Sequence, residues 1–371
     1  MKITDIKCIT LRLPNKLDIA DSSRDTVIIK VFTDEGIIGI GEADTHPEIA
    51  KAIINASWSH GDSHGIKDCI IGEDPFDVQK IWDKVYRKTA HYGRRGILIE
   101  VLGGIDIALW DIMGKATGKP IYKLLGGSFR NKVKAYVSTL FPYSKKEDVM
   151  KKTETFVKKG FKAIKFGWGI FGKEFKEDIE LVRAIRDLVG DDIYLMVDGG
   201  ECMNASEAIK RAKALEEFNV YWFEDPLLLD DLNGYAKLTK ESPVKIALGE
   251  AETTHYPFER LINLGIDIIQ PDISRVGGIS ECMKIIQMAD DKGVLPVIHL
   301  WKTGISIAAA LHVLAAMKQD SFLEFCITDS PLLNDLTVEK FDIDKEGMVC
   351  VPNKPGLGIE LNDEIVEKYA F

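Results

Sequence analysis

The chain has 371 residues, of which 46% are hydrophobic and 29% charged, and its net charge at pH 7 is −10. This length exceeds one ordinary domain and suits a barrel with a smaller second domain, and the composition is typical of a soluble globular protein. The acidic balance argues against nucleic acid as a partner. No stretch approaches the roughly 18 apolar residues of a membrane span, so we expect no membrane association.

The six cysteines are scattered and none forms a CxxC pair. Such cysteines indicate free thiols in a reducing compartment rather than a disulfide framework. The N-terminal segment also lacks an apolar core of signal-peptide length. We therefore predict a cytoplasmic protein.

Strand patterns followed by helix patterns occupy the first part of the chain. Residues 2–13 and 26–42 alternate like strands, and the turn TDEG divides the second of these runs into a hairpin. Residues 47–60 and 75–90 predict helices, and a long apolar helix from Ile97 ends at Gly118 and Pro120. This order predicts an α+β capping domain over residues 1–128.

From Val133 onward, strand and helix patterns alternate. Eight short apolar runs are followed by loops and, except for the last, by helical stretches, which predicts a TIM-type β/α barrel over residues 129–335. After Pro331 the alternation ends, and residues 336–371 look like strand and turn material. We expect this C-terminal segment to return to the capping domain and complete it.

Six ionisable residues recur in the barrel region at nearly one fixed interval. They stand in or just after successive apolar runs: Asp198, Glu224, Glu250, Asp272, His299 and Glu324. A strand, loop and helix together take roughly 25–30 residues in such a barrel, so each of these residues ends one strand. Closing the barrel brings all six to one mouth.

Asp198, Glu224 and Glu250 end three successive strands. One carboxylate at a strand end is more often a helix cap or a surface charge, whereas three in the same register favour a cation site. Gathered carboxylates repel one another, and oxygen ligands without Cys or His favour Mg²⁺ over zinc. The sequence therefore predicts a magnesium site.

The remaining polar strand ends predict a catalytic set. Asp272 and His299 end neighbouring strands, where the carboxylate would fix the imidazole tautomer and raise its basicity. We expect acidic surroundings to raise the pKa of Glu324, so that it could donate a hydrogen bond to an oxyanion. Lys165 is expected to point into the barrel with Ala163 and Gly167.

These motifs resemble those of the enolase superfamily, specifically its mandelate racemase-like subgroup, over essentially the whole chain. The resemblance is carried by GIDIALWDIMGKATGKPIYKLLGG and by VDGG, FEDP, LGE, QPDISRVGG, IHLW and LEF in order. It implies that Asp198, Glu224 and Glu250 bind Mg²⁺. It also implies an ene-diolate formed by abstraction of the proton α to a substrate carboxylate.

The same resemblance implies roles for the other four residues. His299 is the expected base and Asp272 orients it, Glu324 donates to the substrate carboxylate, and Lys165 contacts that carboxylate too. Two positions depart from the subgroup: Gly167 stands where many relatives have a second lysine base, and Gly200 where many have Asn.

The departure at Gly167 bears on the reaction, because a racemase needs a base on each face whereas one base suffices for dehydration. We therefore expect an acid-sugar dehydratase that eliminates water. A racemase or epimerase of a 2-hydroxy acid is the alternative, and a catalytically retired metal-binding barrel is the second alternative.

Further candidates for substrate binding are less specific. Segments of the capping domain could bring several side chains to the pocket of a sugar acid, and Trp301 could line it or pack in the core. These cap candidates are Arg24, His46, His91, Tyr92, Arg94 and Arg95. The family resemblance also implies a homo-oligomer.

Overall fold

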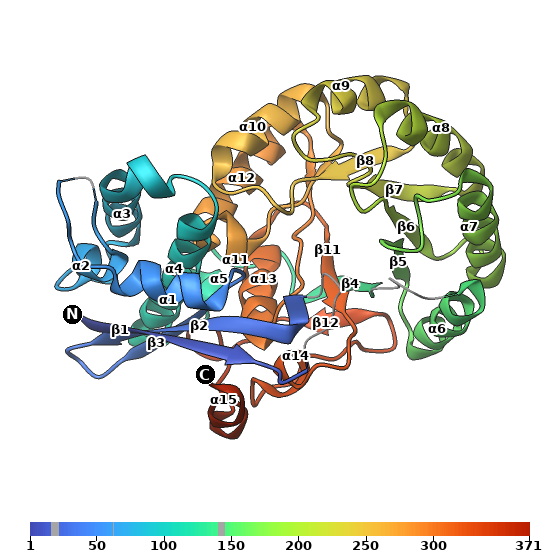
Figure 1. Cartoon of the computed structure of the whole chain (residues 1–371). Coiled ribbons are helices and arrows are strands. Elements are labelled where there is room, and N and C mark those ends of the chain that lie inside the picture. The colour runs from blue at the N-terminus through green and yellow to red at the C-terminus, as the bar shows by residue number, and fades with distance from the viewer. Residues whose placement is uncertain (16–21, 62, 140–144) are drawn as a thin grey trace.

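The computed structural model describes residues 1–15, 22–61, 63–139 and 145–371. An N-terminal layer of strands and helices lies beside a ring of strands that is surrounded by helices (Figure 1). This arrangement is the predicted capping domain beside a barrel.

The capping sheet is antiparallel in the order β1-β2-β3. The strands are β1 (Ile3–Arg12), β2 (Asp25–Thr33) and β3 (Ile38–Ala43), and a short 3-10 helix, η1 (Ser22–Arg24), precedes β2. The helices are α1 (Pro47–Asn55), α2 (Ile66–Ile70), α3 (Val78–Gly93), α4 (Ile97–Thr117) and α5 (Ile121–Leu124). The predicted hairpin and the long helix are confirmed, whereas the predicted helix 47–60 ends at Asn55 because the chain turns extended at Ala56.

Helix α4 is mostly buried because it packs against the capping sheet on one side and the barrel helices on the other. Its backbone comes very close to the barrel at Gly103, where an added Cβ would lie 2.9 Å from the Gly278 nitrogen. The apolar all-round sequence of this helix therefore reflects burial between two domains.

Eight parallel strands form the second domain in the order β10-β9-β8-β7-β6-β5-β4-β11. They are β4 (Lys132–Ser138), β5 (Ala163–Gly167), β6 (Tyr194–Asp198), β7 (Val220–Glu224), β8 (Lys245–Leu248), β9 (Ile268–Ile269), β10 (Leu295–Pro296) and β11 (Phe322–Cys326). A parallel bridge between Ile298 and Leu323 joins the two ends of this order. The predicted barrel of eight strands is thus confirmed.

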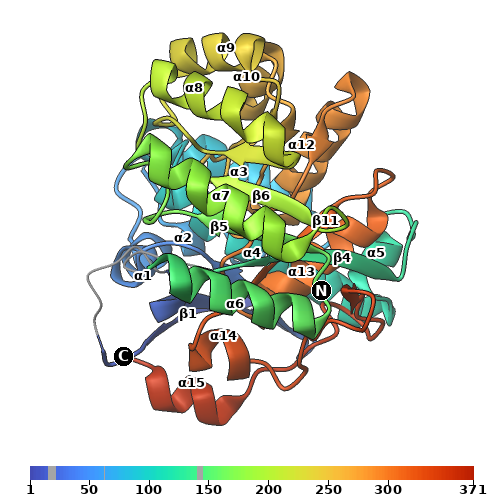
Figure 2. The same cartoon turned by 90° about the vertical axis from the view of Figure 1, so that its right-hand side faces the viewer.

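The barrel helices cover the outside of the strands, and α6, α7 and α8 lie side by side in Figure 2. Apolar strand residues face these helices on one side, and a smaller cluster that includes Tyr136, Trp222 and Phe322 fills the interior. The elements are α6 (Lys146–Lys159), α7 (Phe175–Val189), α8 (Ala205–Leu215), η2 (Glu216–Phe218), α9 (Leu232–Glu241), α10 (His255–Leu264), α11 (Ile273–Val276), α12 (Gly278–Lys292) and α13 (Gly304–Ala316).

The C-terminal segment contacts both domains. It contains β12 (Met348–Cys350) and α15 (Asp363–Tyr369), and α14 (Pro331–Asp335) directly precedes it. Strand β12 pairs antiparallel with β4 of the barrel, while Phe371 exchanges hydrogen bonds with Thr10 of the capping sheet. Within the described ranges, no helix is long and apolar enough to cross a membrane.

Candidate active site

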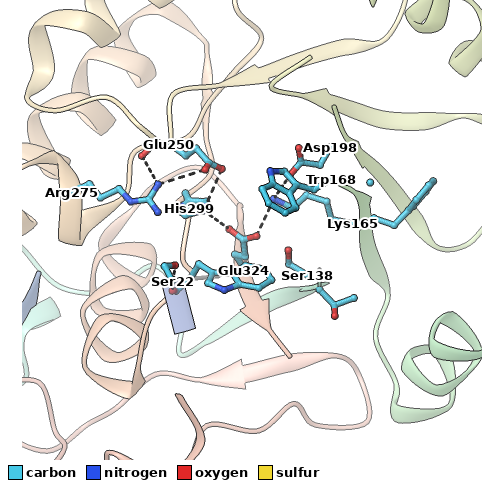
Figure 3. A pocket seen from close by; sticks show the side chains of 13 residues that line it. Ser22, Ser138, Lys165, Trp168, Asp198, Glu250, Arg275, His299 and Glu324 are labelled. Atoms are coloured by element: carbon cyan, nitrogen blue, oxygen red, sulfur yellow. Dashed lines mark hydrogen bonds and ion pairs between the residues drawn. The ribbon is translucent and has the colours of Figure 1, made fainter. Parts of the chain in front are cut away.

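A cavity of about 360 Å³ lies at the mouth formed by the carboxyl ends of the barrel strands (Figure 3). Parallel strands of a closed barrel all point their carboxyl ends to this face, which is where side chains from distant sequence positions meet. The described residues that line it are Ser22, Ser138, Thr139, Lys165, Phe166, Gly167, Trp168, Asp198, Glu250, Arg275, His299, Trp301 and Glu324.

The three predicted metal ligands follow neighbouring strands. Asp198 and Glu224 are the last residues of β6 and β7 and are paired across the ladder, and Glu250 follows β8 by two residues. Lys165 on β5 contacts two of these carboxylates. Its Nζ binds Glu224 and lies 3.7 Å from Asp198 Oδ2. The Trp222 indole N–H donates to the other oxygen of Glu224, at 2.8 Å.

Burial and mutual repulsion act on these carboxylates together. Burial, with repulsion from Glu224 and Glu250, raises the pKa of Asp198 well above its usual range. Burial also raises the pKa of Glu224, although Lys165 opposes that rise. The positive charge near these two carboxylates is therefore too small to stabilise both in their ionised form.

The donor chemistry of the mouth fits Mg²⁺, which prefers carboxylate oxygens and retained water. Four carboxylates (Asp198, Glu224, Glu250 and Glu324) are in contact with three cations, Lys165, Arg275 and His299, so negative charge is in excess. Among the described residues, no group of three His, Cys, Asp or Glu side chains already has the spacing to hold an ion. The set supplies suitable ligands and excess negative charge, and ligation would require these side chains to draw together.

His299 and Asp272 form a buried pair, with Nδ1 of the ring 2.7 Å from Asp272 Oδ2. Ser274 donates to the other Asp272 oxygen from both its backbone N–H and its hydroxyl, which fixes the carboxylate. Burial lowers the pKa of His299, but Glu250, Glu324 and the bond to Asp272 outweigh it and raise the pKa to about 9. The second nitrogen, Nε2, lies 3.3 Å from Glu250 and faces the cavity (Figure 3).

The expectation of a raised pKa at Glu324 is wrong. Burial raises the pKa, but Lys165 at 3.0 Å and His299 at 3.9 Å outweigh burial and hold the pKa at about 2. The prediction rested on the acidic residues at the neighbouring strand ends. The sequence does not show that the Lys165 ammonium lies between them. Glu324 is therefore an ionised acceptor in this arrangement, and the backbone N–H of Leu300 donates to it.

The wall formed by β5 has the predicted orientation. Lys165 lines the cavity and Ala163 packs in the barrel interior, while Ile164 and Phe166 pack toward the helices. The backbone at Gly167 has φ +136°, and an added Cβ would lie 2.0 Å from the Asp198 carbonyl oxygen. No L side chain fits there without backbone movement. The strand geometry therefore requires the glycine that distinguishes this chain from many members of the subgroup.

The cap candidates lie away from the described cavity lining, whereas Trp301 lines it. His46 is exposed and pairs with Glu48, and Tyr92 donates to the carbonyl of His64. Their substrate role stays a prediction. Two further cap candidates, Arg24 and Arg95, contact the Asn15 carbonyl and the Tyr256 ring, respectively.

Several cavity residues were not singled out from the sequence. Ser138 ends β4 and Thr139 follows it, so the strand-end position that predicts the carboxylates also applies to these two residues. Arg275 stands inside the quoted QPDISRVGG motif, three residues after Asp272. Trp168, the residue after Gly167, has a positive φ of +32°, and no feature of the sequence predicts this conformation.

A capping sheet docked on a β/α barrel, with carboxylates and a His–Asp pair at the mouth, defines the architecture of the enolase superfamily. The chain matches the mandelate racemase / muconate lactonizing enzyme N-terminal domain over residues 5–126 and the enolase C-terminal domain-like family over residues 148–365. It belongs to this family, in the mandelate racemase-like subgroup.

Curated relatives of similar length carry two kinds of activity. The chain is 36% identical to arabinonate dehydratase from Saccharolobus solfataricus, with 95% of this chain and 92% of that protein covered. It is 33% identical to D-galactarolactone cycloisomerase from Agrobacterium fabrum, with 100% and 99% covered. The relatives are enzymes, and their sequences alone do not select one reaction.

Solved structures give the same result for the fold. The 3,6-anhydro-D-galactonate cycloisomerase from Zobellia galactanivorans superposes with a TM-score of 0.89 at 30% identity, and all of both chains is covered. A racemase from Streptomyces coelicolor with bound magnesium has a TM-score of 0.86 at 26% identity, covering 100% of both chains.

Proposed function

We propose that this protein is a Mg²⁺-dependent acid-sugar dehydratase. The observation that carries the proposal is the asymmetry of the cavity: the His299–Asp272 pair forms one wall, and Gly167 stands where a second base would be needed. Lys165 on the Gly167 wall is no substitute base, because Glu224 and Glu324 hold it as a cation and its pKa is raised well above the usual range despite burial.

In this proposal Asp198, Glu224 and Glu250 hold the ion. Bound Mg²⁺ would supply Lewis-acid stabilisation of the charge that develops on the substrate carboxylate. Glu250 is the main charge that keeps His299 protonated, so with Glu250 engaged by the ion the ring would be neutral at Nε2. The neutral His299 would then take the proton from the carbon next to that carboxylate through Nε2, while Asp272 keeps Nδ1 protonated and the ring oriented. The imidazolium then returns the proton to the departing β-hydroxyl, so that water leaves and one base completes the elimination.

Lys165 would bind and orient the substrate carboxylate from the opposite side, and the ionised Glu324 would position the Lys165 ammonium. Lys165 provides a fixed positive charge, and Glu324 keeps that ammonium in place at 3.0 Å. The substrate is a small carboxylate, which we propose to be a sugar acid because arabinonate and D-galactonate dehydratases are among the relatives.

The test is a substrate panel. Purified protein with Mg²⁺ is incubated with C4–C6 aldonates and aldarates, and a carbonyl reagent detects the 2-keto-3-deoxy acid. Product from one stereochemical set supports the proposal and identifies the substrate. No product from any member, with Mg²⁺ bound and the fold intact, would contradict it.

An isomerase is the second candidate, supported by the D-galactarolactone cycloisomerase relative. Incubation in D₂O separates the two: a racemase or epimerase incorporates deuterium at C2 without forming a keto acid. A retired barrel predicts neither product nor exchange. Cytoplasmic location and homo-oligomeric assembly stay predictions, and light scattering on the purified protein tests the assembly.

A further inference from the structure

Asp44 stands immediately after β3 of the capping domain and is buried against the barrel. One of its oxygens accepts from Arg275 at two points, Nε at 2.7 Å and Nη2 at 2.6 Å. The other oxygen accepts from Lys302 at 2.9 Å. A single carboxylate of the cap therefore binds two cations that belong to the barrel.

Arg275 has other carboxylates within reach. Its Nη1 lies 3.2 Å from the Glu250 carbonyl oxygen and 3.6 Å from Glu250 Oε1, and its Nε lies 3.9 Å from Asp272 Oδ2. Figure 3 shows the guanidinium beside Glu250 at the edge of the cavity. The two shortest contacts nevertheless go to Asp44, so Asp44 decides which way the guanidinium faces.

If Asp44 lost its charge, the Arg275 guanidinium would turn toward other carboxylates. A guanidinium that is mostly buried needs a charged partner, and charge-assisted pairs are the strong ones. With Asp44 neutral, the other carboxylates in contact with Arg275 are those of Glu250 and Asp272. A Glu250 carboxylate drawn into a closer pair with arginine offers less negative charge to a metal ion, and an Asp272 carboxylate paired with arginine holds His299 less firmly.

We propose that Asp44 is a positioning residue that keeps Arg275 from pairing more closely with Glu250 and Asp272, and so leaves these two carboxylates available to Mg²⁺ and His299. The inference rests on the proposed function, because it assumes that Glu250 ligates the ion. It also makes the cation site dependent on the docked cap, since Asp44 comes from the other domain.

Glu42 provides a matched control. It is a buried carboxylate in β3, two residues before Asp44, and it also connects the cap to the barrel, through Thr303 at 2.9 Å and Ser306 at 2.7 Å. Its hydrogen bonds involve hydroxyl and backbone N–H groups rather than Arg275. A role in domain docking alone would make the two carboxylates equivalent.

The experiment measures binding of Mg²⁺ alone by titration calorimetry, together with thermal unfolding. Asp44→Asn should weaken Mg²⁺ binding at least tenfold, because Arg275 turns to Glu250. Glu42→Gln should lower the unfolding temperature and leave Mg²⁺ affinity within twofold of wild type. The double variant Asp44→Asn/Arg275→Met should recover affinity to within about threefold, because the competing cation is gone.

Wild-type affinity in Asp44→Asn, or a double variant as weak as Asp44→Asn, would overturn the inference. Should Asp44→Asn not fold, Asp44→Glu keeps the charge but displaces Arg275 by one methylene, and the same loss and recovery on adding Arg275→Met are expected. A wild-type protein that binds no Mg²⁺ would remove the proposed function and this inference together. A wild-type protein that binds Mg²⁺ with an unaffected Asp44→Asn removes only the inference.

Discussion

His299 and His312 are both buried, yet their surroundings give them opposite chemistry. His299 lies between carboxylates at the barrel mouth, and its pKa is raised to about 9 despite burial. His312 lies in α13, stacks on Tyr122 and donates from Nε2 to the Leu357 carbonyl at 3.1 Å; burial lowers its pKa to about 4. Burial alone thus says little about a histidine, and the charges around it decide what it can do.

The largest effect that tests this contrast is on catalysis. His299→Asn should lower kcat for the acid-sugar substrate about a thousandfold, because a positioned general base contributes that order of rate. His312→Gln should leave kcat within threefold, since its contacts are to Tyr122 and Leu357. Steady-state assay of the keto product measures both. Equal losses in the two variants would show that burial, rather than the carboxylate surroundings, makes His299 important.

The charge surroundings of His299 can be changed through Lys165. Lys165→Met leaves Glu224 and Glu324 without the cation between them, so the free energy of unfolding without Mg²⁺ should fall by about 3 kcal/mol. Added Mg²⁺ should restore part of that loss by binding the released carboxylates.

Lys162→Met is the control for this prediction, because Lys162 is exposed and adjoins the same strand. Its unfolding free energy should change by no more than about 0.5 kcal/mol. Urea denaturation with and without Mg²⁺ measures both variants, and a Lys165→Met protein as stable as wild type without Mg²⁺ contradicts the assigned ion pairs.

A substitution at Gly167 tests the contrast between the His299–Asp272 wall of the cavity and the wall formed by β5. Gly167→Ala should cost roughly 3 kcal/mol of stability and weaken Mg²⁺ binding, because its Cβ would displace the Asp198 backbone. Gly293 also has a positive φ, of +69°, but open space around it, so Gly293→Ala should cost only about 1 kcal/mol and leave Mg²⁺ affinity unchanged. Equal effects on Mg²⁺ binding would show that steric contact with Asp198 is unimportant.

Regular features of this molecule could be predicted from sequence because they repeat. The interval from Asp198 to Glu324 follows from the strand–helix unit of a barrel, and the inward direction of Lys165 follows from the alternation along a strand. The asymmetry at Gly167 was visible as a departure from a pattern, although its steric cause was not.

Contacts between distant segments could not be predicted in this way. Asp44 and Arg275 are separated by 231 positions, and no periodicity links them. The lowered pKa of Glu324 depends on the reach of the Lys165 ammonium, which is set by three-dimensional distance rather than by neighbours in sequence. Residue type and a place in the capping domain are all that the sequence offers for His46 and Tyr92, and neither indicates which way a surface segment faces.

The smallest predicted effect is the pH dependence that His312 gives to stability. Its pKa is about 4 in the folded chain and 6.5 in an exposed histidine, so below pH 6.5 the unfolded chain binds a proton that the folded chain does not. Stability must therefore fall as the pH drops through this window, by about 2 kcal/mol at pH 5 at 1.36 kcal/mol per pH unit.

Urea denaturation at pH 7 and pH 5 measures this effect. The loss of unfolding free energy between the two pH values should be smaller in His312→Gln than in wild type, by that amount. The carboxylates shared by both proteins cancel in this difference, and His60→Gln, at an exposed position, should behave as wild type. An unchanged acid loss in His312→Gln would mean that His312 already binds a proton in the folded chain, and the contrast with His299 would disappear.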